Sequence, residues 1–265
     1  MAYDLIELEI SDGIALLRFN RPQVLNSLND PLIDEIRSGL ADVAKDPAAR
    51  ALVITGAGRG FCAGADLSGG SMTPDLSLGE AVAESMEEFF NPLVRDLFHL
   101  EKPTVAAVNG IAAGGGVGLA LTADIVLAAR SASFKLIFVP KLGIIPDCAA
   151  SFHLQRLIGR ARALGMSMLG ESIPAERAAE WGLIWSCVDD DALMDEAMAI
   201  AGRLAAGPTL AFAHLRSVLA AADHNTLDEQ LDLERDTQRV LCDSEDFREG
   251  TLAFLQKRQP KFKGR

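Results

Sequence analysis

The sequence predicts an α/β fold followed by a helical C-terminal region. Short apolar runs alternate with helical patterns through the first half of the chain, glycine-rich loops follow two of these runs, and the pattern after about Asp147 is nearly all helical. Strands that alternate with helices are expected to pair in parallel through right-handed crossovers. The chain has 265 residues, of which 49% are hydrophobic, so it can bury a large core. We assign the α/β core to residues 1–200 and the helical region to 201–265.

The chain is expected to begin with a hairpin and a helix. Residues 5–10 and 14–19 are apolar-rich runs on either side of a Ser-Asp-Gly turn. A helix is expected to start at Asn29-Asp30-Pro31, with Asp30 as its N-cap and the proline early in its first turn. Its apolar residues recur at helical spacing: Leu32, Ile33, Ile36, Leu40 and Val43.

Three near-continuous apolar runs predict strands that are buried on both faces: 51–55, 104–108 and 125–129. A long helical pattern over 78–100 is expected to break near Asn91-Pro92, since proline lacks the N–H that a helix needs. In the second half, a short strand at 184–188 is expected among helices. The predicted helices are 174–181, 192–206, 209–221, 226–242 and 245–257.

Composition and charge argue against several kinds of partner. Lys and Arg total 25 against 37 Asp and Glu, and the net charge of −12 disfavours nucleic acid and anionic membranes. Residues 104–123 carry no charge, but they are mainly small, so a strand, a glycine turn and a helix are expected there instead of a membrane span. The four cysteines and four histidines lack metal-binding spacings. With no visible signal peptide, a reduced cytoplasmic protein is expected.

Three loops combine flexible backbone with residues suited to chemistry. Loop 56–67 follows a buried strand and loop 109–118 lies between a strand and a helix, and glycines in both allow backbone N–H groups to point at a ligand. Both loops are equally compatible with ordinary tight packing. In the third loop, 141–148, Asp147 is either the N-cap of a helix or a catalytic carboxylate.

These loops and their neighbours resemble the crotonase (enoyl-CoA hydratase/isomerase) family over nearly the whole chain. The resemblance implies a crotonase-like (ClpP/crotonase) α/β fold, with a core of repeated ββα units wound into a superhelix and a C-terminal helical oligomerisation region. Segments of the second half look like the ring-1,2-epoxyphenylacetyl-CoA isomerase branch: 178–185, 225–228, 230–236 and 247–250. The family motifs are Asn20-Arg21-Pro22, Asn26-Ser27-Leu28, 58–67, Lys102-Pro103, 107–110, 114–116, 143–147 and 157–163.

The resemblance also implies site residues. The backbone N–H groups of Ala65 and Gly115 would form a thioester oxyanion hole, in which one donor is typically worth about 3–4 kcal/mol. Asp147 stands where the isomerase branch carries its single carboxylate. Lys257, on the last helix, is a candidate for the nucleotide phosphates. No cofactor is expected to be bound, because the substrate carries coenzyme A. The residues expected to line the coenzyme A site are Ala63, Gly64, Ala65, Asp66 and Leu67.

Departures from the family pattern favour one reaction. A hydratase would carry glutamates at Gly118 and near Ile137-Phe138, and neither position has a carboxyl here. A lone Asp147 favours isomerisation, and the expected reaction is ring-1,2-epoxyphenylacetyl-CoA to the oxepin. The alternatives are a Δ3,Δ2-enoyl-CoA isomerase, an enoyl-CoA hydratase and, in another class, an inactive scaffold or RNA-binding member. Family members are usually trimers, so a homotrimer or a dimer of trimers is expected.

Two local features bear on the acyl pocket. The neighbours of Asp147 are apolar, and a dry wall there would raise the pKa of its carboxyl: Leu142, Ile144, Ile145 and Pro146. Ala149-Ala150 replaces a glycine pair common in relatives, and the stretch 134–143 is one residue longer than usual. Either departure is expected to reshape the pocket.

Overall fold

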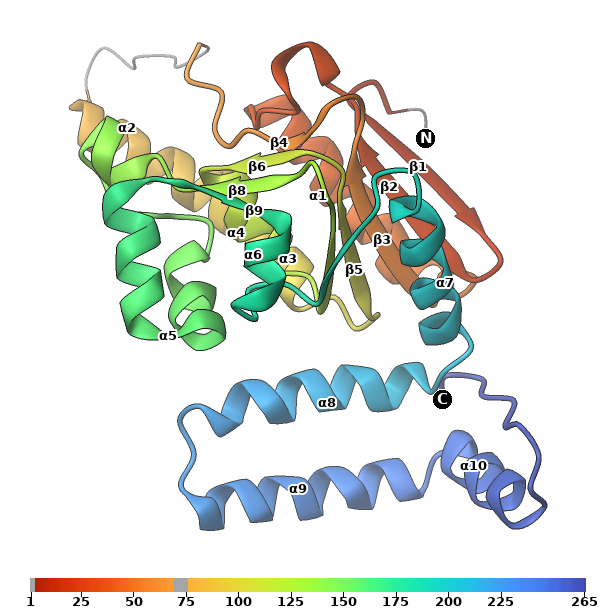
Figure 1. Cartoon of the computed structure of the whole chain (residues 1–265). Helices are drawn as coiled ribbons and strands as arrows, with labels where there is room; N and C mark the ends of the chain where they lie inside the picture. The colour runs from red at the N-terminus through yellow and green to blue at the C-terminus, as the bar shows by residue number, and fades with distance from the viewer. Residues whose placement is uncertain (1–2, 69–75) are drawn as a thin grey trace.

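A six-stranded sheet forms the larger layer of the fold (Figure 1). The computed structural model describes residues 3–68 and 76–265. The strand order is β1-β2-β3-β5-β7-β10; β1 and β2 form an antiparallel hairpin, and every later pair is parallel. The strands are β1 (Ile6–Ser11), β2 (Ile14–Phe19), β3 (Ala51–Gly56), β5 (Thr104–Val108), β7 (Ile125–Ala129) and β10 (Ser186–Val188).

A second, smaller sheet lies against the first and takes one strand after each of β3, β5 and β7. Its order is β4-β6-β8-β9, parallel except for the antiparallel pair β8–β9. A helix follows each such strand pair, so the core consists of successive ββα units, as the predicted fold class requires. The short strands are β4 (Gly60–Cys62), β6 (Ile111–Ala113), β8 (Ser133–Lys135) and β9 (Ser172–Pro174).

The helices after these strand pairs include two π-helical segments. Residues 78–98 are helical throughout, with the π segment η2 just before Pro92, where a break was expected. Pro92 is the second residue of α3 and directly follows the π turn, in which Asn91 N donates to Met86 O five residues back, so the helix continues past the proline. The elements are α2 (Leu78–Ser85), η2 (Met86–Phe90), α3 (Asn91–Phe98), α4 (Gly115–Leu121), η3 (Phe138–Leu142) and α5 (Ala150–Leu169), the last interrupted at Gly159.

Helix α1 (Asp30–Lys45) packs on the hairpin, and its start corrects one prediction. The N-cap is Asn29, whose side-chain oxygen accepts a hydrogen bond from Leu32 N at 3.1 Å. Asn29 has extended backbone angles, whereas Asp30 is already helical and so cannot cap. The 3-10 turn η1 (Pro22–Val24) precedes this helix.

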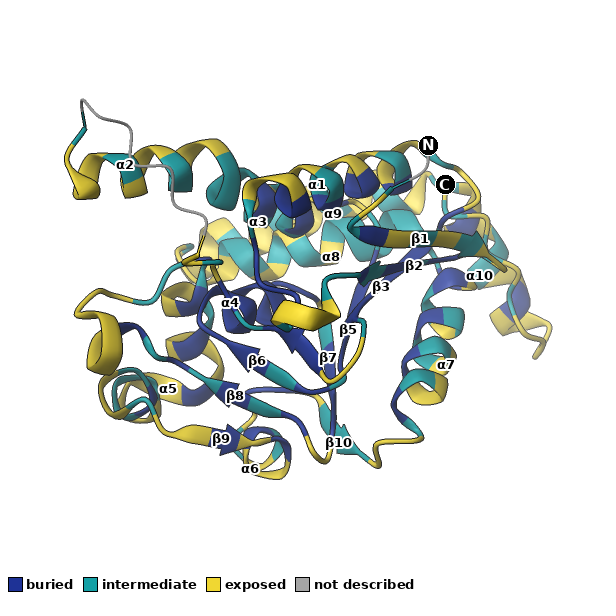
Figure 2. Cartoon of the chain, turned by 90° about the horizontal axis from the view of Figure 1, so that it is seen from above, coloured by how far each residue is buried: buried dark blue, intermediate teal, exposed yellow. Residues whose placement is uncertain are grey.

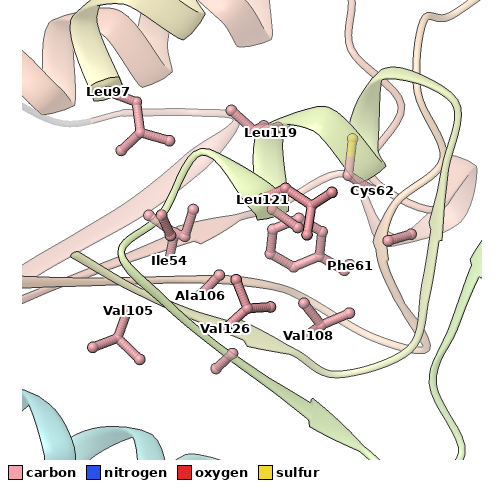
Figure 3. Packing of buried hydrophobic residues seen from close by; sticks show 14 of the residues in the cluster. Ile54, Phe61, Cys62, Leu97, Val105, Ala106, Val108, Leu119, Leu121 and Val126 are labelled. Atoms are coloured by element: carbon pink, nitrogen blue, oxygen red, sulfur yellow. The ribbon is translucent and has the colours of Figure 1, made fainter. Parts of the chain in front are cut away.

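The hydrophobic core lies between the two sheets and α4. Figure 3 shows Phe61 of β4 beside Ala106 and Val126 of the large sheet and Leu121 of α4. Every residue of β3 and β5 is buried, as expected for strands covered on both faces, and Figure 2 shows them in dark blue. The loops that carry the candidate site therefore start from a rigid interior.

The remaining helices lead from the core to a helical module, which we define as α8–α10. Helix α7 packs on β3 and β5, whereas α8 and α9 form an antiparallel pair set apart from the sheets in Figure 1. The predicted boundary at 200/201 falls inside α7, and the chain leaves the core after it. The elements are α6 (Ala175–Glu180), α7 (Leu193–Ala205), α8 (Thr209–Ala222), α9 (Leu227–Cys242) and α10 (Glu245–Leu255).

Polar contacts hold the helical module to the core. Arg216 of α8 forms a salt bridge with Asp124 at 2.7 Å and donates a hydrogen bond to Phe98 O at 2.7 Å. Arg50 donates to Thr209 at the start of α8 and to Phe262 O in the C-terminal tail. Within the described ranges no single helix is long and apolar enough to cross a bilayer; α7 and α8 reach that length only as a pair bent by 102°.

Candidate active site

The part of the first glycine loop that follows β4 lies directly against the second glycine loop. Gly64 has a φ of +88°, which favours glycine. A Cβ added to Gly64 would lie 2.9 Å from Ala113 O and 3.1 Å from Gly115 N. Tight backbone packing therefore brings the segment that carries Ala65 next to the segment that carries Gly115.

The N–H of Ala65 is left free by its strand pairing. Leu28 N donates to Gly64 O and Asp66 N donates to Leu28 O, both at 2.8 Å, which forms an isolated parallel bridge between Leu28 and Ala65. In such a bridge the N–H and C=O of the middle residue point away from the partner strand. Ala65 is also exposed, so its N–H can donate a hydrogen bond to a ligand.

The N–H of Gly115 is available because this residue opens α4. The preceding Gly114 has φ 53° and ψ −130°, a conformation that side chains disfavour, and its turn directs the chain into the helix. The first N–H groups of a helix have no acceptor four residues back. Gly115 is buried at the end of the turn, where its N–H lies at the positive end of the short helix.

Asp147 lies beside Gly115 and does not cap a helix. A Cβ added to Gly115 would lie 3.4 Å from Asp147 Oδ1 and 2.8 Å from Cys148 Sγ. Helix α5 begins three residues later, at Ala150, and its N-cap Ala149 makes no side-chain capping bond. The structure therefore contradicts the N-cap interpretation of Asp147 and brings its carboxyl against the residue predicted to supply an oxyanion donor.

The carboxyl of Asp147 is half-buried, which raises its pKa above the ordinary value of 3.8. Desolvation is the main cause, and hydrogen bonding with the Cys148 thiol and with the backbone opposes it. The pKa of Asp147 is raised, as predicted, but the neighbouring apolar residues of the loop do not form the dry wall that was expected to cause it. Leu142, Ile144 and Ile145 are 42%, 49% and 78% exposed in this chain. Burial of the carboxyl comes instead from its approach to α4.

The positions where a hydratase would carry glutamates are filled by other atoms. A Cβ added to Gly118 would lie 2.0 Å from Cys148 O, so no side chain fits there. The ring of Phe138 is buried and reaches to 3.7 Å from a Cβ added to Gly114. The backbone of Cys148 and the ring of Phe138 therefore fill the space around Gly114–Gly118 in which the second carboxyl of a hydratase is expected.

The residues predicted to bind coenzyme A fall into two places. Within Ala63–Leu67, Gly64 is buried, Ala63 and Asp66 are half-exposed, and Ala65 and Leu67 are exposed, Leu67 by 71%. The carboxyl of Asp66 accepts hydrogen bonds from Ser68 and pairs with Arg21 at 3.0 Å, and these contacts lower its pKa. Lys257 follows α10 instead of lying on it, with a φ of +53°. Figure 1 places α10 at the far end of the molecule from β4, so one chain does not bring Lys257 to this loop.

Sequence reasoning missed the side chains that shape the first loop. Asn26 is fully buried and bonds Gly60 O at 2.8 Å and Ala57 O at 3.0 Å. Arg21 donates to Ser27 O and pairs with Asp66, which ties the start of the chain to the loop. Polar residues in the motifs around residues 20–28 were the available signal, since buried amides normally bond backbone groups. No cluster of three metal-ligating side chains occurs among the residues described.

The arrangement defines a class of site: two adjacent free backbone amides with one partly buried carboxyl next to them, suited to an acyl group that gains negative charge on its oxygen. The sequence model of the enoyl-CoA hydratase/isomerase family matches residues 9–265. The chain therefore belongs to the enoyl-CoA hydratase/isomerase, or crotonase, family, as the resemblance predicted, and it is an enzyme of a family that acts on acyl-CoA thioesters.

Known relatives of this chain include both isomerases and hydratases. It is 48% identical over 261 residues to the 1,2-epoxyphenylacetyl-CoA isomerase of Escherichia coli strain K12, covering 97% of each. It is 43% identical over 265 residues to a Rhodobacter capsulatus protein named "Probable enoyl-CoA hydratase", covering 100% of each. The crystal structure of an enoyl-CoA hydratase from Bacillus anthracis matches with a TM-score of 0.90 and 30% identity, over 99% of this chain and 100% of that one.

Proposed function

We propose that this enzyme isomerises an acyl-CoA, with ring-1,2-epoxyphenylacetyl-CoA as substrate and the seven-membered oxepin thioester as product. The observation that carries the proposal is the single carboxyl of Asp147 next to Gly115. The 48% identity to an isomerase of that name supports the choice of substrate. No resident cofactor is needed, because the chain's own groups supply the chemistry.

In the proposed mechanism, the Asp147 carboxylate removes a proton from C2 of the acyl group. The thioester oxygen becomes negatively charged, and the N–H groups of Ala65 and Gly115 donate hydrogen bonds to it. The carbon–carbon bond shared by the epoxide and the six-membered ring then opens, which brings the oxygen into the ring. Protonated Asp147 returns the proton to a ring carbon, so the product has the same composition as the substrate.

Hydration is disfavoured because it needs a second acid or base to activate water. Gly118 has no room for a side chain, since Cys148 O already fills that space. Phe138 contributes an apolar ring at the other expected position. Both contacts favour a reaction in which a single carboxyl transfers a proton and no water is added to the substrate.

A Δ3,Δ2-enoyl-CoA isomerase is the second candidate, because the same single carboxyl serves a proton transfer between C2 and C4. An enoyl-CoA hydratase is the third candidate, because the chain is 43% identical to a relative named as a probable enoyl-CoA hydratase. Three thioesters separate these functions: enzymatically prepared epoxyphenylacetyl-CoA, a 3-enoyl-CoA and crotonyl-CoA. Spectrophotometry and mass spectrometry of each product are expected to show turnover of the epoxide without mass change. A product that has gained water would contradict the proposal.

We further propose that coenzyme A lies along Ala63–Leu67 and that Lys257 reaches the nucleotide phosphates from another subunit. Its distance from the loop within one chain supports this division, as does the proposed homotrimer or dimer of trimers. Substitution Lys257→Glu is expected to raise KM and leave kcat nearly unchanged. If Lys257→Glu leaves the KM for acyl-CoA unchanged, the phosphate role is wrong.

The proposed assembly is supported by apolar surface that one chain leaves uncovered. Helices α8 and α9 contain no buried residue, and Leu215 and Leu219 are 52% and 63% exposed on one face of α8. They line a cleft of about 2100 Å³ between α8 and the core. A second copy of the chain would cover such a face. Light scattering after gel filtration is expected to give trimers or hexamers, and smaller species for Leu219→Asp.

A further inference from the structure

Cys148 occupies an unusual backbone position immediately after Asp147. Its φ is +48° and that of Ala149 is +60°, both in the left-handed region that residues with a side chain disfavour. Such conformations persist only where the surrounding structure enforces them. Two successive residues in this region turn the chain sharply between Asp147 and α5, so the direction of the Asp147 side chain depends on how Cys148 is held.

Cys148 is held against α4 at two points. Its Sγ lies 2.8 Å from the place of a Cβ on Gly115, and its carbonyl oxygen lies 2.0 Å from the place of a Cβ on Gly118. These glycines are one turn of α4 apart, so side-chain and backbone contacts of one residue grip the same face of the helix. The thiol is buried, with the residue 5% exposed. Through Gly115, Cys148 therefore touches the proposed oxyanion donor while its neighbour carries the proposed base.

The thiol faces two titratable groups, the carboxyl of Asp147 on its own turn and the thiol of Cys62 in β4. Burial, followed by the nearby Asp147 charge, raises the pKa of the Cys148 thiol far above its usual range, so the thiol stays neutral. A neutral thiol is a weak hydrogen-bond donor. The sulfur of Cys148 and Oδ1 of Asp147 both lie against Gly115, at 2.8 and 3.4 Å from an added Cβ. Burial raises the pKa of the Asp147 carboxyl, and hydrogen bonding with the Cys148 side chain, followed by the backbone, lowers it.

We propose that Cys148 is a positioning residue for the acid/base group: its packing on Gly115 sets the spacing between the Asp147 carboxyl and the oxyanion amide, and its S–H donates to the carboxylate. This inference rests on the proposed role of Asp147. It assigns the buried thiol no nucleophilic or redox chemistry. It also gives a reason for a side chain at a backbone position that would suit glycine.

The test compares Cys148→Ser, which keeps a donor of similar size, with Cys148→Ala, which removes it. Cys148→Ala is expected to lower kcat roughly 3- to 10-fold with little change in KM. The midpoint of the pH–rate profile is expected to rise by about half to one pH unit, because the carboxylate loses a donor. Cys148→Ser is expected to recover most of both effects. Cys187→Ala, which removes a half-buried thiol from β10, is the control and should match the unmodified enzyme.

A second measurement separates this inference from the proposed function. Carbon NMR of labelled aspartate, assigned with Asp147→Asn, follows the carboxyl titration without substrate. A higher Asp147 pKa in Cys148→Ala than in the unmodified protein supports the thiol contact even if the reaction is misassigned. Equal titration curves overturn the inference, as does an equal loss of activity in the alanine and serine variants with an unchanged pH midpoint. Full turnover by Asp147→Asn would instead overturn the proposed function.

Discussion

The two sides of the candidate site are built in opposite ways. On the amide side, backbone packs so closely on the glycines of α4 and the first loop that added Cβ atoms at Gly64 and Gly116 would lie 2.9 and 2.2 Å from the oxygens of Ala113 and Cys62. On the carboxyl side, the loop before Asp147 is open: Gly143 has no described residue within 4 Å of an added Cβ, and Ile145 is 78% exposed. The amide side therefore tolerates almost no change, and variation in substrate choice is expected to arise on the carboxyl side.

The largest expected effect comes from Asp147→Asn, which removes the only proposed proton carrier and keeps the shape of the turn. Turnover is expected to fall about 10²- to 10⁴-fold, the usual contribution of a general acid or base. Binding of a non-reactive acyl-CoA, measured by calorimetry, should stay within a few-fold, because the amide side is untouched. If binding fell as much as turnover, the carboxyl side would be holding the ligand, and the amide side would not be sufficient for binding.

A matched pair of glycine substitutions tests the packing difference directly. In Gly116→Ala the new Cβ meets Cys62 O at 2.2 Å, and overpacking is expected to reduce the free energy of unfolding by about 1–3 kcal/mol. Gly165, in α5, has none of the described residues within 4 Å of an added Cβ, so Gly165→Ala is expected to add about 0.5–1 kcal/mol through helix propensity. Urea denaturation measures both. Equal changes in the free energy of unfolding for the two substitutions would show that the amide side has room for an extra methyl group.

The raised pKa of Asp147 predicts opposite trends for activity and stability as pH rises. The native protein binds this proton more tightly than the unfolded chain, so its free energy of unfolding, relative to Asp147→Asn, falls as pH rises from 3.8 to the raised pKa and is then constant. Turnover rises over the same range, because the base must be ionised. Paired denaturation and rate profiles test this; a rate that is flat through acidic pH would contradict it.

The long buried strands and most helices of the chain were predictable from apolar pattern. Residues 104–108 and 125–129 are strands with the predicted ends, because continuous apolar runs mark strands covered on both faces. The strands of the second sheet were not predicted, since segments such as Gly60–Cys62 are three residues long and too short for any periodicity. The structural ββα repeat is consequently invisible as a repeat of sequence.

The candidate site was predictable in its loops and not in its contacts. Glycine clusters after buried strands indicated where backbone donors could gather, but family resemblance, not spacing, singled out Ala65 and Gly115. That Gly64 lies against Gly115 depends on packing between residues far apart in the chain. The stretch 134–143, which is predicted to be one residue longer than usual, contains the π-helical turn η3, a local form that sequence periodicity does not reveal; the extra residue itself stays a prediction.

The smallest expected effect is that of Ala149→Gly on the carboxyl side. Ala149 has a φ of +60°, a conformation in which a side chain costs roughly 1–2 kcal/mol. Glycine relieves this strain but gives the unfolded chain more freedom, so the net gain in the free energy of unfolding is expected to be about 0.5–1 kcal/mol. Urea denaturation measures it, and kcat should change less than in Cys148→Ala, because the atoms nearest to an added Cβ on Gly115 belong to Asp147 and Cys148. A destabilised Ala149→Gly would indicate that the methyl group makes packing contacts that outweigh the strain, and the carboxyl side would then be packed as tightly as the amide side.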